Sequence, residues 1–353
     1  MPLENPNQPI KITLDDLASV ETPVLAPPGT EAKPGQARVY GNVGDSAELQ
    51  VQTPEERGSI FLQAWFYLGF AGLLGAFLGW AICEHAFTDG NTGPRWGNFV
   101  IIPMVITSEC VGFAIAESIV ERSARKAIIR GLLALPLGVV LAFAFDIGAE
   151  AIFAIGVNIV AAAGVQSSHN PAFWIVRGVA WLVFGAAGGV VYGIVGQSSK
   201  QTAYGALGGS LGALVGGLLF DPIAMLTKGG ATSRAVGFSL LGMATGIAIG
   251  LVESAMKDRW LYVTAGPLAG KQFILYKPRT IIGSDQHSDI YLFKDSNIQA
   301  QHAVIEITGA RVQLRAMGNV FVSGLPAKLQ VLQSGSPIQI GRYGFRYQER
   351  QRK

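Results

Sequence analysis

Charge and cysteine are both scarce in this sequence. Asp, Glu, Lys and Arg make up only 14% of its residues, whereas a soluble globular chain carries about 25%. The two cysteines, Cys83 and Cys110, show no metal-ligand spacing and cannot provide a disulfide framework. A net charge of +3 is too small to indicate binding to nucleic acid. These absences argue against a disulfide-rich domain, a zinc module and a nucleic-acid-binding protein.

Long apolar segments occupy the middle of the chain. Hydrophobic residues make up 50% of the sequence, and several uncharged segments reach the roughly 20 residues that cross a bilayer. We expect about six membrane spans, at 60–83, 98–120, 127–147, 173–196, 203–225 and 234–256. Residues 1–57 are rich in Pro, Glu and Gly and predict a disordered tail, in which Ile10–Leu17 could become ordered on a partner. Residues 58–257 are therefore expected to form an α-helical transmembrane bundle.

The basic loops predict the orientation of the spans. Lys and Arg accumulate in cytoplasmic loops, and the densest basic loop is Arg122–Lys126, after the second span. This places the N-terminus in the cytoplasm, and six spans return the C-terminus there. The stretch 128–165 is too long for one span and contains Asp146. We expect a helix that ends near Asp146, followed by a re-entrant or interfacial segment. A seventh span at 147–165 would instead put the C-terminus outside.

Glycine is abundant, with 45 residues, and part of it follows a repeat. An arginine followed by small residues four apart occurs at Arg130, Arg177 and Arg234. A spacing of four puts the small residues on one helix face, where another helix can pack closely. The repeat predicts a compact bundle and makes an oligomer through glycine-rich helices possible; a transporter built from structural repeats is the alternative. The glycines of these faces are Gly138, Gly185, Gly189, Gly193, Gly208, Gly212, Gly216, Gly242, Gly246 and Gly250.

One acidic residue lies near the middle of a span. Glu109 shares a face of the second span with Glu117 and Glu121, but these two, like Glu253, lie near cytoplasmic ends that can reach the interface. An ionisable group near the bilayer midplane is costly and often functional. Two interpretations of Glu109 remain open. It could belong to a proton or cation path along the second helix, or it could form an internal pair with a polar or basic group on another helix.

The sequence periodicity changes after Arg259. Short segments alternate apolar and polar residues between Gly, Pro, Asn and Asp, which predicts an all-β sandwich over 258–353. The expected strands are 260–264, 272–275, 280–283, 290–293, 302–308, 312–315, 320–322 and 337–341. We find no pairing of a nucleophile with a base, no Gly-rich phosphate loop and no metal-ligand set. We therefore expect no enzyme, no cofactor and no metal.

Segments of this module resemble a known family. RTIIGSDQHSDIYL, DSNIQAQHAVIEI, AMGNVFVSGLPA and SGSPIQIGRYGF follow the order of a forkhead-associated (FHA) domain over roughly 258–348. The resemblance implies an eleven-stranded sandwich, which in typical members binds phosphothreonine peptides through loops at one end. Several spans followed by such a domain also resemble bacterial FHA membrane proteins. This implies a multi-pass protein of the inner (plasma) membrane.

The resemblance also implies roles for individual residues. Gly283 and His302 match structural residues of the family, whereas Ser284 and Gln299 stand where the family has Arg and Ser. Because an Arg fork grips a phosphate dianion, its absence at Ser284 predicts weak phosphothreonine binding; Lys294 could compensate in part. The residues expected to contact a partner are Ser284, Lys294, Gln299 and Asn319.

The sequence therefore predicts a membrane-anchored scaffold or signalling protein. Its cytoplasmic FHA-like domain would dock a protein or phosphoprotein, while the spans contact the lipid bilayer. A transporter or channel regulated by the FHA-like domain is the alternative. The basic residues of the module could also lie against anionic lipid headgroups.

Overall fold

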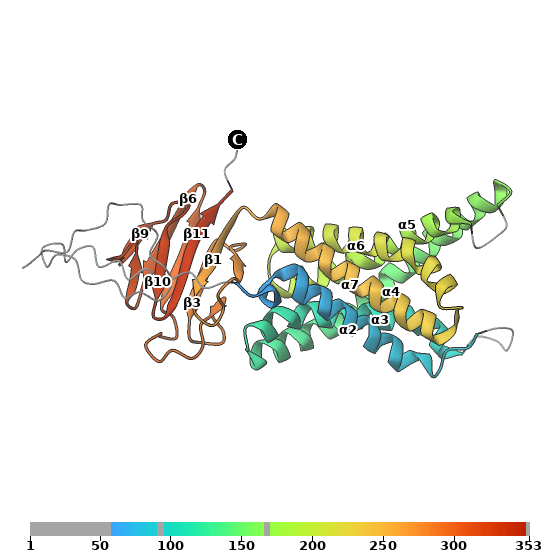
Figure 1. The fold of residues 1–353 in the computed structure, drawn as a ribbon, viewed down its shortest axis with the longest axis horizontal. Helices are drawn as coiled ribbons and strands as arrows, with labels where there is room; N and C mark the ends of the chain where they lie inside the picture. Colours follow the sequence, from blue (N-terminus) through green and yellow to red (C-terminus); the bar gives the residue numbers. More distant parts are fainter. Residues whose placement is uncertain (1–57, 90–94, 166–169, 351–353) are drawn as a thin grey trace, which may run out of the picture. The chain divides into compact units, whose positions relative to one another are not determined.

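A computed structural model describes residues 58–89, 95–165 and 170–350. These residues belong to one compact unit, in which a helical bundle is followed by a β-sandwich (Figure 1). The predicted disordered tail, 1–57, lies outside the described residues. The helices are the short 3₁₀ helix η1 (Ile60–Leu62), α2 (Ala64–Glu84), α3 (Trp96–Val120), α4 (Ala124–Ala162), α5 (Pro171–Val195), α6 (Ser199–Leu226) and α7 (Gly230–Met256).

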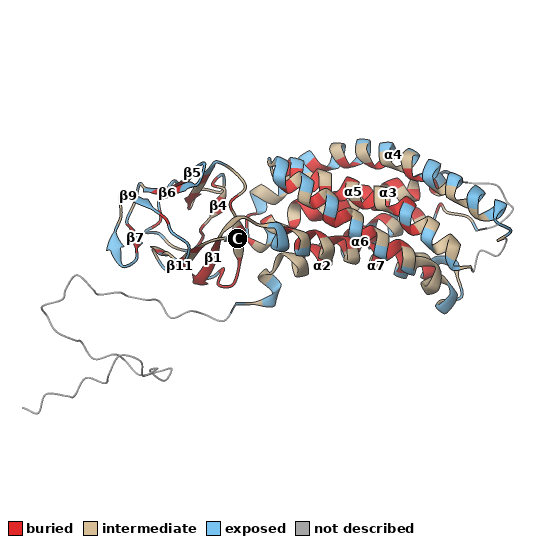
Figure 2. Cartoon of the chain, turned by 90° about the horizontal axis from the view of Figure 1, so that it is seen from above, coloured by how far each residue is buried: buried red, intermediate tan, exposed pale blue. Residues whose placement is uncertain are grey.

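Helices α2 to α7 are each long and apolar enough to cross a membrane, which confirms the prediction of six spans. Buried residues concentrate on α3 and α5, whereas α4 exposes much of its length (Figure 2). Exposed Leu, Ile and Val side chains on α4 would be costly in water but are compatible with a lipid environment. The pattern of burial is therefore that of a bundle with α3 and α5 inside.

Helix α4 differs from its predicted form. It was expected to end near Asp146, but it continues unbroken to Ala162 and spans 39 residues. A charge in an apolar sequence does not break a helix, and 147–162 contains no proline and many good helix formers. The helix ends where Gly164 takes the left-handed conformation (φ 84°) that commonly terminates helices. The described residues therefore contain neither a re-entrant segment nor a separate seventh span in this stretch.

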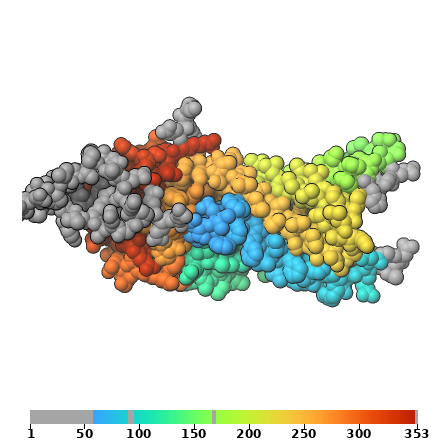
Figure 3. Space-filling view, viewed as in Figure 1, coloured from blue at the N-terminus to red at the C-terminus, as the bar shows by residue number. Residues whose placement is uncertain are grey.

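The predicted glycine faces form the contacts between helices. On α5 and α6, Gly185 lies against the backbone of Gly209, and Gly189 lies against that of Gly205. On α2 and α7, a side chain added at Gly246 would collide with the main-chain carbonyl of Leu68. Figure 3 shows α2 directly against α7 on one face of the molecule. The prediction that these glycines allow close helix packing is confirmed.

The three arginines of the repeat make ion pairs with other helices. Arg130 Nη1 lies 3.0 Å from Glu117, and Arg177 Nε lies 2.9 Å from Asp221. Arg234 is bound by Glu84 at 2.5 Å, and also by Asp89. Each pair joins one helix to another or to its flanking loop, so the repeat supplies an electrostatic link as well as a close-packing face.

The β-sandwich consists of two sheets of mostly antiparallel strands. One sheet has the order β2-β1-β11-β10-β7-β8, and the other has the order β4-β3-β5-β6-β9. Apolar side chains from both sheets, among them Leu261, Ile305 and Phe345, form its core. The strands are β1 (Arg259–Ala265), β2 (Gln272–Ile274), β3 (Arg279–Gly283), β4 (Ile290–Tyr291), β5 (Ala303–Thr308), β6 (Arg311–Ala316), β7 (Val320–Val322), β8 (Leu325–Pro326), β9 (Leu329–Val331), β10 (Pro337–Ile340) and β11 (Tyr343–Glu349).

The sandwich confirms the predicted all-β class and adds three strands. Strands β8 and β9 expose every residue, so they lack the alternation of burial that a sequence pattern can reveal. Strand β11 does alternate, with Tyr343, Phe345 and Tyr347 buried, and its signal was available in the sequence. It pairs with β1 and β10 and is central to its sheet.

Candidate functional site

Three loops converge at one end of the sandwich, and we call them the apical loops: 284–289, 292–302 and 317–319. The first follows Gly283, where an added side chain would collide with the carbonyl of Ala300 in the second loop. Ser284 donates its Oγ proton to Ile298 O at 2.7 Å, and its backbone N–H donates to Gln299 O at 3.0 Å. Ser284 is therefore committed to holding two loops together.

His302 joins the second apical loop to the third. Its ring is buried, with 2% exposure. Gln299 N donates to Nδ1 at 3.1 Å, so the ring proton is on Nε2, which lies 3.1 Å from Asn319 O. These two bonds fix the positions of Gln299 and Asn319, whose side chains are exposed. In this geometry His302 organises the loops and does not itself face a ligand.

Lys294 begins the second apical loop in an exposed, left-handed conformation (φ 61°). The next residue, Asp295, accepts backbone N–H bonds from Arg342 and Asn297, each at 3.0 Å. The bond from Arg342 is the main reason that the pKa of Asp295 lies below its usual range. This bond ties the start of the loop to the turn between β10 and β11. The structure thus brings Ser284, Gln299 and Asn319 together directly and places Lys294 beside that turn.

A second site, which the sequence did not reveal, lies where the sandwich meets the bundle. Lys271, in the loop after β1, is 1% exposed, and its Nζ lies 2.7 Å from Glu121 and 3.6 Å from Glu117. Lys126 Nζ lies 3.3 Å from Glu121 and donates to Asp289 O at 3.2 Å. We call Lys271, Glu117, Glu121, Lys126 and Arg130 the junction network. These residues link α3 and α4 to the sandwich.

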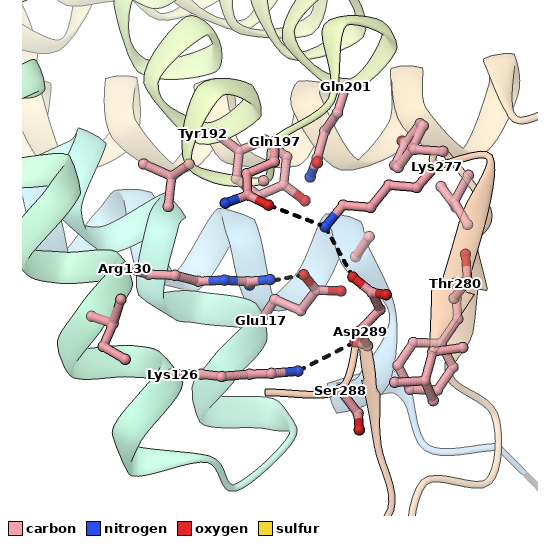
Figure 4. Close-up of a pocket in the computed structure, with 18 of the residues that line it drawn as sticks. Glu117, Lys126, Arg130, Tyr192, Gln197, Gln201, Lys277, Thr280, Ser288 and Asp289 are labelled. Carbon is pink, nitrogen blue, oxygen red and sulfur yellow. Dashed lines mark hydrogen bonds and ion pairs between the residues drawn. The ribbon is translucent and has the colours of Figure 1, made fainter. Parts of the chain in front are cut away.

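Three residues of the junction network, Glu117, Lys126 and Arg130, line a cavity of about 310 Å³ (Figure 4). Arg130 points at Glu117, and Lys277 reaches between Gln197 and Asp289, in the view of Figure 4. Nearby, Tyr276 donates to Glu253 at 2.8 Å. Burial is the main cause that raises the pKa of the Tyr276 phenol, and the neighbouring Glu253 raises it further. The cations and carboxylates around the cavity are therefore largely paired with one another.

This arrangement corrects the expectation that Glu121 and Glu253 can reach the membrane interface, whereas Glu117 is only half-buried. Glu121 is 1% exposed and Glu253 is 2% exposed, because the sandwich covers this end of the bundle. The sequence identified these residues as acidic groups near helix ends but contained no signal for the partner that covers them. From the sequence alone, Lys271 could not be told from an ordinary polar residue of a surface turn.

Glu109 lies inside the bundle, with 5% exposure. Its Oε1 has no hydrogen-bond partner within the described part of the chain, so the internal pair that one interpretation expected is not seen there. A cavity of about 10 Å³ lies beside it, lined mostly by apolar side chains that include Trp181 and Phe184. Across 58–89, 95–165 and 170–350, no cluster of three His, Cys, Asp or Glu residues could hold a metal ion.

Comparisons with known proteins concern the C-terminal module. Residues 262–351, 90 of the 353, match a family described as the inner membrane component of T3SS, cytoplasmic domain. The oxoglutarate dehydrogenase inhibitor of Corynebacterium efficiens is 36% identical over 86 residues, which are 24% of this chain and 60% of that relative. The chain thus spans about three fifths of that relative's length.

Two solved structures are similar to the same region. The FHA domain of CT664 from Chlamydia trachomatis is 28% identical, with a TM-score of 0.25. The match covers 27% of this chain and 100% of that chain. The cytoplasmic domain of the T3SS sorting platform protein PscD from P. aeruginosa is 25% identical, with a TM-score of 0.24. The match covers 27% of this chain and 83% of that chain. The resemblance of the C-terminal module to FHA domains is confirmed.

Proposed function

We propose, starting from the FHA fold of 259–349, that this chain is a non-enzymatic scaffold of the inner membrane whose FHA domain docks a protein partner. In this proposal, residues 58–257 anchor the chain and 258–353 recognise the partner on the cytoplasmic side. The family description and the six apolar helices support the setting of a multi-pass inner-membrane protein.

The observation that carries the proposal is the arrangement of the apical loops. Ser284 and His302 use their polar groups to hold the loops together. The side chains of Lys294, Gln299 and Asn319 are exposed: Gln299 and Asn319 are joined through His302, and Lys294 lies in the same loop as Gln299. Loops presented by a rigid sandwich are a common means of binding a partner. Two of these side chains are amides, which can donate and accept hydrogen bonds without requiring a charged ligand.

Photo-crosslinking tests this docking surface. A photoreactive amino acid at Gln299 or Asn319 of the intact chain, in its native membrane, should capture the same protein at both positions, because His302 holds these residues together. Ala310 provides a matched exposed control, since it lies in the turn at the other end of β5. Equal capture at Ala310, or no capture at the apical positions, would remove the basis for this function.

The orientation of the chain is also part of the proposal. A reporter active only in the periplasm should be silent after Lys353 and active when inserted after Gly164, between α4 and α5. This result is expected because the basic loop Arg122–Lys126 stays in the cytoplasm. Measured reporter activity after Lys353, normalised to protein level, provides the check. High activity there would place the FHA domain outside and contradict cytoplasmic docking.

Transport regulated by the FHA domain remains a second candidate because of one observation. Helix α3 carries the buried Glu109, and the same helix is bound by Lys271 of the FHA domain. A change in the FHA domain could therefore reach the intramembrane carboxyl through one rigid element. Under the scaffold function, Glu109→Gln should leave crosslinking at Gln299 unchanged; a loss of capture would favour the coupled alternative.

A further inference from the structure

The cavity of about 310 Å³ between the bundle and the sandwich contains buried polar groups that the chain does not satisfy. Gln201 of α6 and Thr280 of β3 line it, and each is only 6% exposed. The Gln201 side chain points into the cavity (Figure 4). Within the described part of the chain, neither the Gln201 amide nor the Thr280 hydroxyl makes a hydrogen bond. Buried polar groups are normally hydrogen-bonded, so these two indicate a bound molecule.

Two lysines converge at one side of this cavity. Lys126 Nζ donates to Asp289 O at 3.2 Å, and Lys277 Nζ lies 2.9 Å from Oδ1 of the same residue. A lysine ammonium has three N–H donors. Each of these ammonium groups uses two, because Lys126 also pairs with Glu121 and Lys277 also donates to Gln197. Each lysine therefore keeps one donor for a ligand.

The charges around the cavity favour an anionic ligand. Arg125 lines the cavity, is exposed, and forms no ion pair among the described residues. The carboxylates that line the cavity already accept hydrogen bonds from the chain. Cations outnumber these carboxylates, with Arg125, Lys126, Arg130 and Lys277 against Glu117, Glu253 and Asp289. An added negative charge would therefore meet a surplus of positive charge.

One wall of the cavity belongs to the outer surface of α4. Ile129 and Leu133 line the cavity, yet they are 44% and 50% exposed. They lie one and two turns beyond Arg125, in the basic first turn of a helix that is apolar enough to cross a membrane. Basic residues at the end of such a helix mark the level of the headgroups. The cavity is therefore lined by side chains that α4 also presents to lipid.

We infer that this cavity binds the headgroup of an anionic glycerophospholipid of the phosphatidylglycerol type. The phosphate would take the free lysine donors and the guanidinium of Arg125. The headgroup hydroxyls, which both donate and accept, would bond to Gln201 and Thr280. One acyl chain would lie along Ile129 and Leu133. Basic pockets between membrane helices on the cytoplasmic side are known to bind anionic headgroups.

A lipid fits these observations better than a soluble phosphate compound. A free phosphate would engage the cations but would leave the apolar wall at Ile129 and Leu133 uncovered. Phosphatidylcholine fits less well, because its headgroup has no hydroxyl for Gln201 or Thr280 and its quaternary ammonium would lie among the cations. The inference goes beyond the proposed docking function and does not depend on it.

Native mass spectrometry of the intact, delipidated chain tests the inference. Dioleoyl phosphatidylglycerol should bind at least about tenfold more tightly than dioleoyl phosphatidylcholine. Arg125→Ala should weaken phosphatidylglycerol binding by about tenfold, as expected for one lost charge-assisted contact, and Gln201→Leu by about fivefold. Leu133→Asn should also weaken it, because the acyl chain would lose an apolar contact. Arg315→Ala removes the same charge as Arg125→Ala from β6, where Arg315 does not line the cavity, and should change nothing.

Three results would overturn the inference. Equal affinity for the two lipids, or wild-type affinity in Arg125→Ala, would show that phosphatidylglycerol binds only around the bundle. Because Arg125 is exposed, this variant should fold normally, which its midpoint of thermal unfolding would check. If inorganic phosphate stabilises the chain as much as phosphatidylglycerol and Leu133→Asn has no effect, the cavity takes a soluble phosphate compound. Crosslinking at Gln299 and Asn319 tests the docking function separately, so either idea can fail without the other.

Discussion

Replacing Lys271 with alanine should destabilise the contact between the FHA domain and the bundle by about 3–5 kcal/mol, the usual cost of removing one partner from a buried ion pair. The Lys271 side chain is 1% exposed, and Glu121, its nearer partner, is 2% exposed. Without Lys271, the carboxylates of Glu117 and Glu121 would have only Arg130 and Lys126 left as ion-pair partners. Thermal unfolding of the intact chain, together with hydrogen exchange of β1 and β2, would measure the loss.

Two further variants give this experiment its controls. Lys200→Ala removes a lysine from an ion pair with Asp258 whose side chains are 58% and 42% exposed. Such an exposed pair contributes only about 0–1 kcal/mol, so the variant should behave nearly as wild type. Lys271→Met combined with Glu121→Gln removes both charges and should recover much of the loss. If Lys271→Ala is no more damaging than Lys200→Ala, the junction network does not hold the FHA domain.

Gly246→Leu should strongly destabilise the bundle. An added side chain at this position would meet the backbone of Leu68 and Gly69, which cannot move aside as a flexible side chain could. Overpacking commonly costs about 1–3 kcal/mol, and a clash with backbone belongs at or above the upper end. We expect helices α2 and α7 to separate, which would lower the midpoint of thermal unfolding in detergent or change the assembly state.

Gly148→Leu is the matched control for this variant. Gly148 is also a glycine inside a membrane helix, but an added Cβ there would lie 3.9 Å from Val183, an ordinary contact distance. Both variants make the same chemical change, so a difference between them reports the closeness of the helices. Equal stability of the two variants would contradict the packing of α2 on α7.

The features that could be predicted from the sequence are those written in local patterns. Apolar length indicates the helices, a spacing of four places Gly185 and Gly189 on one face, and alternation indicates the strands of the sandwich. Helix α4 was missed in its second half because Asp146 looks like an interruption, although a single charge does not oppose helix formation. The exposed edge strands β8 and β9 carry no alternation and were missed for that reason.

The features that could not be predicted depend on contacts between distant segments. Lys271 and Glu121 are 150 residues apart, and neither the turn nor the helix end indicates the other. Arg122 was informative only as part of a basic loop that reports orientation. Its position over Phe293 depends on how the FHA domain docks on the bundle, which no local pattern encodes. The resemblance to FHA domains therefore located the loops of the candidate site. The charged contacts between the bundle and the sandwich could be found only from the tertiary structure.

The length of α4 produces a larger hydrophobic mismatch than that of any other helix from α2 to α7. Beyond its basic end at Arg130, residues 131–162 extend about 48 Å at about 1.5 Å per residue, against roughly 30 Å of hydrocarbon. Even at a tilt of about 40°, near the upper limit for such helices, about 7 Å would protrude. Its second half exposes Ile147, Ile155 and Ile159, with 73%, 61% and 65% exposure. Longer acyl chains would cover more of these isoleucines, so α4 makes the fit of the protein to its membrane depend on bilayer thickness.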